Sequence, residues 1–323
     1  MAFEKELEVA LDAVVRASRL CQQVRTEIAE PGTLKKDDRS PVTVADYGAQ
    51  AVVLQELRIA FPDIPAVAEE SSAALKEAAN QGLFERVQSY VHMVSNRDFD
   101  ICEAIDYGAH PGGASGRFWA LDPIDGTKGF LRNDQYAVAL GLIEDGEVVL
   151  GVLGCPALAP DGAIFTAVRG QGAQQRDMAG GNARTIRVRE PESLAAARFV
   201  ESVESGHTKH GWSAQIAERL GITNEPVRMD SQAKYAALAQ GAAQIYLRLP
   251  SRPGYRERIW DHAAAKLVAE EAGARISDVT GAPLDFSRGR KLEHNRGVVA
   301  ATPGTFDAVI EAVKAIVPQT EEA

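Results

Sequence analysis

The sequence predicts a two-part protein, with an α+β half over residues 1–180 and an α/β half over residues 181–323. The length of 323 residues favours two units at roughly 150 residues per domain. The middle of the chain holds successive strands joined by short turns, which is typical of a meandering sheet. After about residue 181, short apolar strands alternate with helical segments, which indicates a layered α/β arrangement.

Composition restricts the kind of partner. The chain carries 45 Asp and Glu against 35 Lys and Arg, a formal net charge of −10, and no long basic run. This excludes a protein that coats a nucleic-acid polymer or an anionic membrane, although it leaves room for a small anionic ligand in a local site. The three cysteines form no CxxC pair, and no apolar run is long enough to span a membrane. We therefore expect a cytoplasmic globular protein.

The first half begins with two predicted helices. Apolar residues recur at three- and four-residue spacing from Leu7 to Ile28, which indicates one long amphipathic helix ended by Pro31-Gly32. A second helix is expected over 44–60, with Thr43 as its N-cap, and a short strand follows at 64–69.

Most later elements are strands. Residues 71–115 show a weaker pattern, with a helix near 83–94. Asp145-Gly146 marks a β-hairpin between two apolar runs. Strands are expected at 118–121, 138–143, 148–153, 163–168, 199–200, 227–228, 245–249, 275–277 and 298–301. Helices of the second half are expected near 213–220, 232–240, 261–272 and 305–316.

The segment Asp122-Pro123-Ile124-Asp125-Gly126-Thr127 carries the clearest chemical signal. Its two carboxylates follow a buried strand and converge if the backbone turns between them, and such oxygens suit Mg²⁺. A helix starting near Gly126 and Thr127 would add backbone N–H groups that favour an anion. The alternative is an Asp-rich turn with capping duties only.

Further carboxylates lie at the ends of other predicted elements. Asp46 begins the second helix, Glu69 and Glu70 end the short strand, and Asp261 begins a late helix. Carboxylates at helix starts usually cap the helix or stabilise its dipole. Their shared position at element ends would nevertheless let them converge on one cleft, and the sequence does not decide which glutamate faces it.

These strings together resemble the inositol monophosphatase superfamily of metal-dependent phosphatases. The motifs are SPVTVADYGAQ, AEES, LDPIDGTKGF and WDHAAAKLVAEEAG. The segments FVESVESGHTKH, DSQAKY and YLRLP are similar to those of its 3′(2′),5′-bisphosphate nucleotidase branch, and the matching strings cover most of residues 35–301. The resemblance implies a layered αβαβα sandwich of the inositol monophosphatase and fructose-1,6-bisphosphatase type.

The resemblance also implies roles for individual residues. It implies up to three Mg²⁺ ions, held by Asp46, Glu69, Asp122, the Ile124 carbonyl, Asp125 and Asp261. Thr127, paired with Asp46, would activate a water molecule. Contacts to the substrate are implied for Gly126, Thr127, His207, Ser231, Lys234, Arg248 and Asp261. An arginine in the apolar strand at 245–249 needs a partner, and a non-reacting 5′-phosphate would supply one. The rival interpretation of Lys234 and Arg248 is routine surface charge.

The expected activity is Mg²⁺-dependent hydrolysis of 3′-phosphoadenosine 5′-phosphate to AMP and phosphate, extending to the corresponding sulfated nucleotide. Two alternatives remain open: a phosphatase of the same mechanism acting on inositol phosphates or sugar bisphosphates, and a non-catalytic nucleotide sensor. The resemblance implies a monomer that is inhibited by lithium and binds a small-molecule nucleotide, with no membrane or nucleic-acid polymer as partner.

Overall fold

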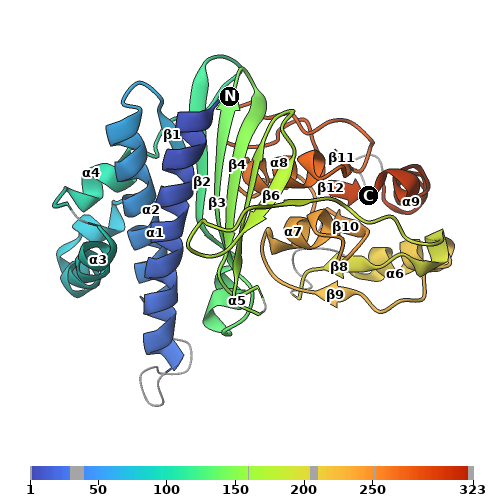
Figure 1. Ribbon diagram of the computed structural model, residues 1–323, viewed down its shortest axis with the longest axis horizontal. Coiled ribbons are helices and arrows are strands. Elements are labelled where there is room, and N and C mark those ends of the chain that lie inside the picture. Colours follow the sequence, from blue (N-terminus) through green and yellow to red (C-terminus); the bar gives the residue numbers. More distant parts are fainter. Residues whose placement is uncertain are drawn as a thin grey trace.

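Five layers of secondary structure make up the molecule. The computed structural model describes residues 2–29, 40–95, 97–158, 160–203, 210–250 and 252–318. Figure 1 shows a helical layer, a large sheet, a second helical layer, a smaller sheet and an outer pair of helices in succession. This order confirms the αβαβα sandwich.

The first layer is built by α1 (Glu4–Ala29) and α2 (Ser40–Ala60), which pack on each other and on the large sheet. The prediction that Thr43 caps α2 is wrong, because the helix already includes Ser40. Pro41 is compatible with this earlier start, since the first turn of a helix has no use for the missing N–H. The helices α3 (Gln81–Val94) and α4 (Ile101–Asp106) pack against the far side of α2.

The large sheet has seven strands in the order β1 to β7, with β1 parallel to β2 and every later pair antiparallel. The predicted hairpin is confirmed, and Asp145 and Gly146 both adopt positive φ, of 50° and 80°. The strands are β1 (Ala66–Ala68), β2 (Arg117–Asp125), β3 (Ala137–Glu144), β4 (Glu147–Cys155), β5 (Ala163–Val168), β6 (Ala173–Arg176) and β7 (Arg184–Ile186).

The central helical layer lies directly on this sheet. A Cβ atom at Gly151 in β4 would come within 2.5 Å of the Ala264 carbonyl oxygen, and one at Gly141 in β3 within 3.1 Å of the Ala263 side chain. Only glycine permits this close approach of α8 (Ala263–Glu271). The glycines thereby set the distance between the large sheet and α8, together with the residues that precede α8.

The smaller sheet has five strands in the order β11-β12-β10-β8-β9. They are β8 (Phe199–Glu201), β9 (Val227–Arg228), β10 (Ile245–Arg248), β11 (Arg275–Ser277) and β12 (Val298–Ala301). The helices of this half are α6 (His210–Arg219), α7 (Ala233–Ala239), α8 and α9 (Pro303–Ile316). The 3₁₀ turns are Ala74–Lys76, Ala78–Asn80 and Leu194–Ala196.

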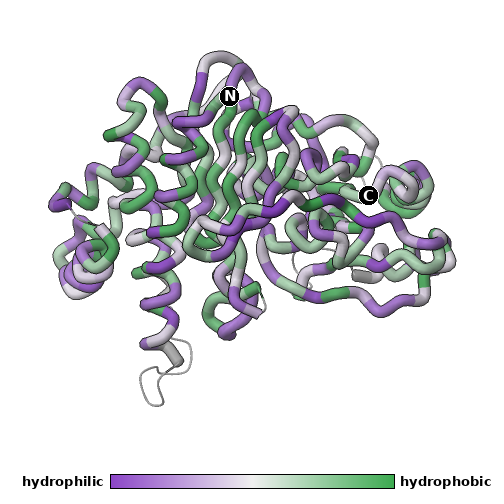
Figure 2. Tube along the Cα trace, viewed as in Figure 1, coloured by the Kyte–Doolittle hydropathy of each residue, from purple (hydrophilic) through white to green (hydrophobic). Residues whose placement is uncertain are grey.

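Hydrophobic residues fill the space between the layers. Figure 2 shows the strands of the large sheet dominated by apolar residues. One apolar core lies between α1, α2 and this sheet, a second lies between the two sheets around α7 and α8, and a third lies beneath α6 and α9. None of the helices in the described ranges is long and apolar enough to cross a membrane.

Candidate active site

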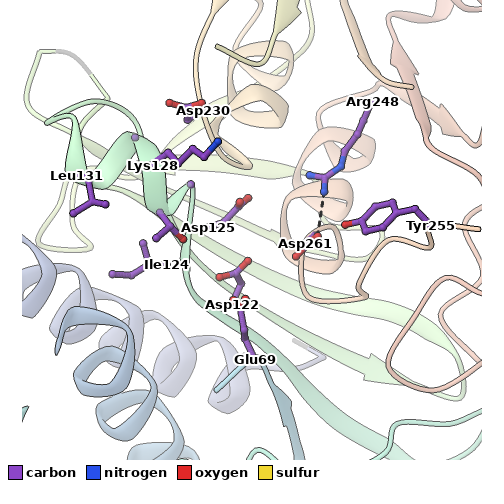
Figure 3. Close-up of a pocket in the computed structure, with 13 residues that line it drawn as sticks. Glu69, Asp122, Ile124, Asp125, Lys128, Leu131, Asp230, Arg248, Tyr255 and Asp261 are labelled. Atoms are coloured by element: carbon purple, nitrogen blue, oxygen red, sulfur yellow. Dashed lines mark hydrogen bonds and ion pairs between the residues drawn. The ribbon is translucent and has the colours of Figure 1, made fainter. Parts of the chain in front are cut away.

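A cavity of about 430 Å³ lies where the two halves of the chain meet. It is lined by Glu69, Asp122, Ile124, Asp125, Gly126, Thr127, Lys128, Gly129, Leu131, Asp230, Arg248, Tyr255 and Asp261. Figure 3 shows the side chains of Asp122, Asp125 and Asp261 gathered around one space. Carboxylates that are far apart in the sequence therefore converge, as the sequence predicted.

Asp122 and Asp125 share one side of the sheet because of a β-bulge. Along β3 the partners of these residues are Ala139 and Ala137, so three steps on β2 match two steps on β3. In a regular strand, side chains three residues apart point to opposite faces. The extra residue of the bulge turns both carboxylates into the cavity. The strand thus continues to Asp125, and the turn expected between the two residues is this bulge.

The backbone after the bulge is pressed against a loop from the second half. Gly126 has φ +88°, and a Cβ atom there would lie 2.9 Å from the Ser231 side chain. A Cβ atom at Gly129 would lie 2.0 Å from the Gln135 carbonyl oxygen. Both glycines of GTKGF are therefore required by close packing. The predicted helix begins at Thr127, but α5 (Thr127–Leu131) has only five residues and carries little dipole.

Glu69 follows the end of β1 and is held there by Gln50 of α2. The fully buried Gln50 amide donates to the Glu70 carbonyl oxygen at 2.8 Å and accepts from the Glu70 N–H at 3.0 Å. Glu69 lines the cavity and Glu70 does not. This resolves the choice between the two glutamates that the sequence left open.

The carboxylates of the first half lie close enough to repel one another. Burial, and then the charges of Glu69 and Asp125, hold the pKa of Asp122 well above its usual range. The Glu69 carboxyl is desolvated although the residue opens to the cavity, and this desolvation, with the charges of Glu70 and Asp125, raises its pKa to about 7. Burial, then Glu70 and Glu69, raise the pKa of Asp46.

One carboxylate oxygen in this group indicates that the site needs a cation. Asp122 is only 2 % exposed, and its Oδ1 atom is buried with no hydrogen-bond partner among the described residues. A buried carboxylate oxygen without a donor is costly unless a cation satisfies it. Hard divalent cations take such oxygens as ligands, so the residues present fit a Mg²⁺ site.

The other side of the cavity carries a cation of its own. Arg248 of β10 pairs with Glu257 at 2.7 Å and with Asp261 at 3.3 Å. Burial alone would raise the pKa of Glu257, but Arg248 and the hydrogen bond from His262 outweigh it and lower the pKa to about 2. His262 Nδ1 in turn lies 2.9 Å from the Tyr235 hydroxyl. The strand arginine thus has two carboxylate partners without any substrate phosphate.

Glu257, Asp261 and His262 could form a cation site by themselves, since their ligand atoms lie within 4.8 Å of one another. Because Arg248 already pairs with two of these residues, we assign no separate metal to them.

The predicted site residues divide into three groups. Glu69, Asp122, Ile124, Asp125, Gly126, Thr127, Arg248 and Asp261 all line the cavity. Asp46, Ser231 and Lys234 do not line it, and no hydrogen bond joins Asp46 to Thr127 in the described part of the chain. His207 lies outside the described residues.

Ser231 and Lys234 lie behind the cavity wall. The N–H of Gln232, next to Ser231, donates to Asp125 Oδ2 at 2.7 Å, which ties this loop to the carboxylates. Lys234 is 2 % exposed, and its Nζ lies 5.6 Å from the centre of the Tyr246 ring. Burial is the main cause that lowers the pKa of Lys234, to about 8. The two residues contact the back of the site rather than its opening.

Five lining residues were not among the predicted site residues: Lys128, Gly129, Leu131, Asp230 and Tyr255. Lys128 and Gly129 belong to the motif LDPIDGTKGF, and Asp230 begins the segment DSQAKY, so their motifs were the available signal. Leu131 and Tyr255 lie just outside the motifs. Asp230 is ion-paired with Arg132, a contact between residues 98 positions apart that no local pattern reveals.

The chain belongs to the inositol monophosphatase family, whose sequence profile matches residues 3–317. This confirms the resemblance found in the sequence. A protein named 3′(2′),5′-bisphosphate nucleotidase from Emericella nidulans is 43% identical, with 98% of this chain and 99% of the relative covered. A protein of the same name from Oryza sativa is 42% identical, with 99% and 97% covered.

Solved structures support the fold. The extragenic suppressor protein suhB from Bartonella henselae superposes with a TM-score of 0.66 at 20% identity, with 96% of this chain and 99% of that chain covered. At this identity the likeness concerns the fold alone.

Proposed function

We propose that this protein is a Mg²⁺-dependent 3′(2′),5′-bisphosphate nucleotidase, which hydrolyses 3′-phosphoadenosine 5′-phosphate to AMP and phosphate. The single observation that carries the proposal is the cavity in which Asp122, with an unpartnered buried oxygen, faces Asp125 and Asp261. The name carried by relatives at 42% and 43% identity over nearly their full length supports the choice of substrate. We extend the proposal to the corresponding sulfated nucleotide.

The metal-binding part of the proposal rests on the carboxylates. Up to three Mg²⁺ ions would be held by Asp46, Glu69, Asp122, Ile124, Asp125 and Asp261. Bound Mg²⁺ neutralises a phosphate dianion and lowers the pKa of a water molecule. The protein itself brings these ligands together. The bulge turns Asp122 and Asp125 to one side, and the hydrogen bond to Gln50 holds the backbone that follows Glu69.

The chain also supplies proton transfer and substrate contacts. The Thr127 hydroxyl, on the cavity wall, orients the attacking water, and Asp46 accepts its proton. This relay requires Asp46 and Thr127, which are not hydrogen-bonded in the described part of the chain, to pair when metal and substrate bind. Gly126 and Thr127 face the reacting phosphate. Arg248, on the wall, contacts the nucleotide. Further nucleotide contacts are proposed for His207, Ser231, Lys234 and Asp261. For Ser231 and Lys234 this requires the wall in front of them to shift when the nucleotide binds.

We also propose that the two halves, 1–180 and 181–323, act as subdomains around this single site. The two sheets divide between residues 186 and 199, slightly after the proposed boundary. A monomer is proposed as the working state, and gel filtration at working concentrations tests it.

Phosphate release from 3′-phosphoadenosine 5′-phosphate, measured with and without Mg²⁺, tests the function. We expect Mg²⁺-dependent turnover with a higher kcat/KM than for inositol monophosphate or a sugar bisphosphate. Asp125→Asn should lower it by more than about 100-fold, beyond the effect of residues that only orient metal ligands. Asp307→Asn, far from the cavity on α9, is the matched control. Equal rates for wild type and Asp125→Asn would reject the proposal. A higher kcat/KM for inositol phosphate would show that the proposed substrate is wrong.

A further inference from the structure

Arg290 connects the end of β1 to the second half of the chain. It lies in the loop between β11 and β12, and its guanidinium is partly buried. One terminal nitrogen donates to the carbonyl oxygens of Gly108 at 3.2 Å and His110 at 3.1 Å, and the other donates to the carbonyl oxygen of Ala68. One side chain thus binds three backbone acceptors that are about 180 to 220 positions away in the sequence.

The Ala68 carbonyl belongs to the peptide unit that leads into Glu69. The next peptide unit, between Glu69 and Glu70, is fixed by Gln50 through the Glu70 N–H at 3.0 Å. Arg290 and Gln50 therefore hold the peptide units on either side of Glu69. Since the direction of a side chain follows from the backbone on both sides of its Cα atom, this pair orients the Glu69 carboxylate in the cavity.

Arg290 is equally tied to the segment that leads into Asp261. Its guanidinium carbon lies 4.8 Å from the centre of the Trp260 ring, a cation–π contact. Its carbonyl oxygen accepts from the Ile259 N–H at 3.2 Å, and the Leu292 N–H donates to the Glu257 carbonyl at 2.9 Å. The stretch before Asp261 is thereby held against Arg290 by backbone and side chain together.

We propose that Arg290 is a positioning residue that sets the separation of Glu69 and Asp261 and thereby tunes the affinity of the cavity for a divalent cation. The inference rests on the proposed metal site, to which Arg290 itself contributes no ligand. The planar fork of a guanidinium can serve three carbonyls and stack on a ring at once, whereas a lysine ammonium is a point charge. Lysine therefore retains the charge at this position and loses the geometry.

The test is Mg²⁺ binding measured by titration calorimetry without substrate, beside thermal unfolding of the metal-free protein. We expect Arg290→Lys to bind Mg²⁺ about 10-fold more weakly, the effect typical of residues that orient metal ligands. At saturating Mg²⁺ it should recover most of the wild-type kcat. Arg275→Lys is the matched control, because Arg275 also stacks on a ring, Phe306 at 4.2 Å, and pairs with Asp307 at 2.7 Å, away from the cavity.

Each result of the Mg²⁺ titration supports or contradicts a specific claim. Wild-type Mg²⁺ affinity in Arg290→Lys, or an equal loss in Arg275→Lys, overturns the inference and leaves the proposed function intact. No Mg²⁺ binding by the wild type overturns the metal site and the inference together. If Arg290→Lys does not fold, Trp260→Phe decides the matter, since a smaller ring weakens the stacking. Weaker Mg²⁺ binding then supports the positioning role, and unchanged binding overturns it.

Discussion

Two walls of the same cavity treat buried charge in opposite ways. The acidic wall consists of Glu69, Asp122 and Asp125 from the first half. The arginine wall consists of Arg248 and Asp261 from the second half, with Glu257 paired to Arg248 behind the lining. Glu69 has its pKa raised to about 7, first by burial, whereas Arg248 overcomes the burial of Glu257 and lowers its pKa to about 2. The pKa values of Glu69 and Glu257 therefore shift in opposite directions, whereas burial outweighs the charge of Arg248 at Asp261 and raises the pKa of that carboxyl.

The difference shows where an external cation is needed. A buried carboxylate is stable when a cation and hydrogen-bond donors compensate its lost hydration. The arginine wall carries its own cation, while in the acidic wall Asp122 Oδ1 has no partner within the part of the chain that the structure describes. A divalent ion is therefore expected to bind chiefly along the acidic wall, with Asp261 reached across the cavity.

The largest expected effect comes from neutralising the acidic wall. Asp122→Asn should lower Mg²⁺ affinity by more than about 100-fold, because a direct ligand is lost and not merely its orientation. The metal-free variant should nevertheless unfold at a higher temperature than the wild type, since the amide removes a buried charge that its neighbours repel. Calorimetric Mg²⁺ titration and thermal unfolding measure the two effects. A variant that binds Mg²⁺ normally, or that melts lower without metal, would contradict this view of the acidic wall.

Removing the charge of Arg248 from the arginine wall should have the opposite effect on stability and destabilise the metal-free protein. Arg248→Met leaves Glu257 and Asp261 buried without their cation, and breaking such a pair lowers the free energy of unfolding by about 3–5 kcal/mol. Denaturant unfolding at pH 7 without Mg²⁺ measures the loss. Arg275→Met, which breaks an exposed pair with Asp307, should cost less than about 1 kcal/mol. Similar values for the two variants would show that the two walls are not as different as their pKa shifts indicate.

Local signals predicted most of the fold. Apolar runs and the Asp145-Gly146 turn located the hairpin, and alternating strands and helices located the second half. Polar strands such as β6 and β7 were missed, because AQQR and RTI carry no apolar pattern. Thr43 failed as a cap because Pro41 is tolerated in the first helical turn.

Long-range contacts were beyond the reach of the sequence. The carboxylates of DPIDGT could be recognised locally, yet the bulge that aligns them depends on pairing with β3. The partners of Arg248 and the carbonyls bound by Arg290 lie on other elements, so nothing near either residue in the chain reveals them. The sequence therefore predicted which charged residues belong to the site. Only the fold shows which of these charges are paired with an opposite charge.

The smallest effect concerns pH and follows from the same contrast. Folded Glu69 titrates near pH 7 and its unfolded form near 4.5, so between these values the folded chain keeps a proton that the unfolded chain has lost. The contribution of Glu69 to the stability of the metal-free protein should therefore fall as pH rises from 5 to 7.5, whereas Glu257, with a lowered pKa, contributes stability that is lost only as pH falls from 4.5 toward 2. Glu69→Gln should flatten the slope of melting temperature against pH in this window, and Glu257→Gln should leave it unchanged. Saturating Mg²⁺ should flatten it in the wild type, because a bound cation favours the ionised carboxylate. Because burial lowers the pKa of His262, that residue adds stability as pH rises toward 6.5 and opposes Glu69. The difference in slope between the wild type and Glu69→Gln is therefore the test, and equal slopes would mean that the acidic wall is already compensated within the protein.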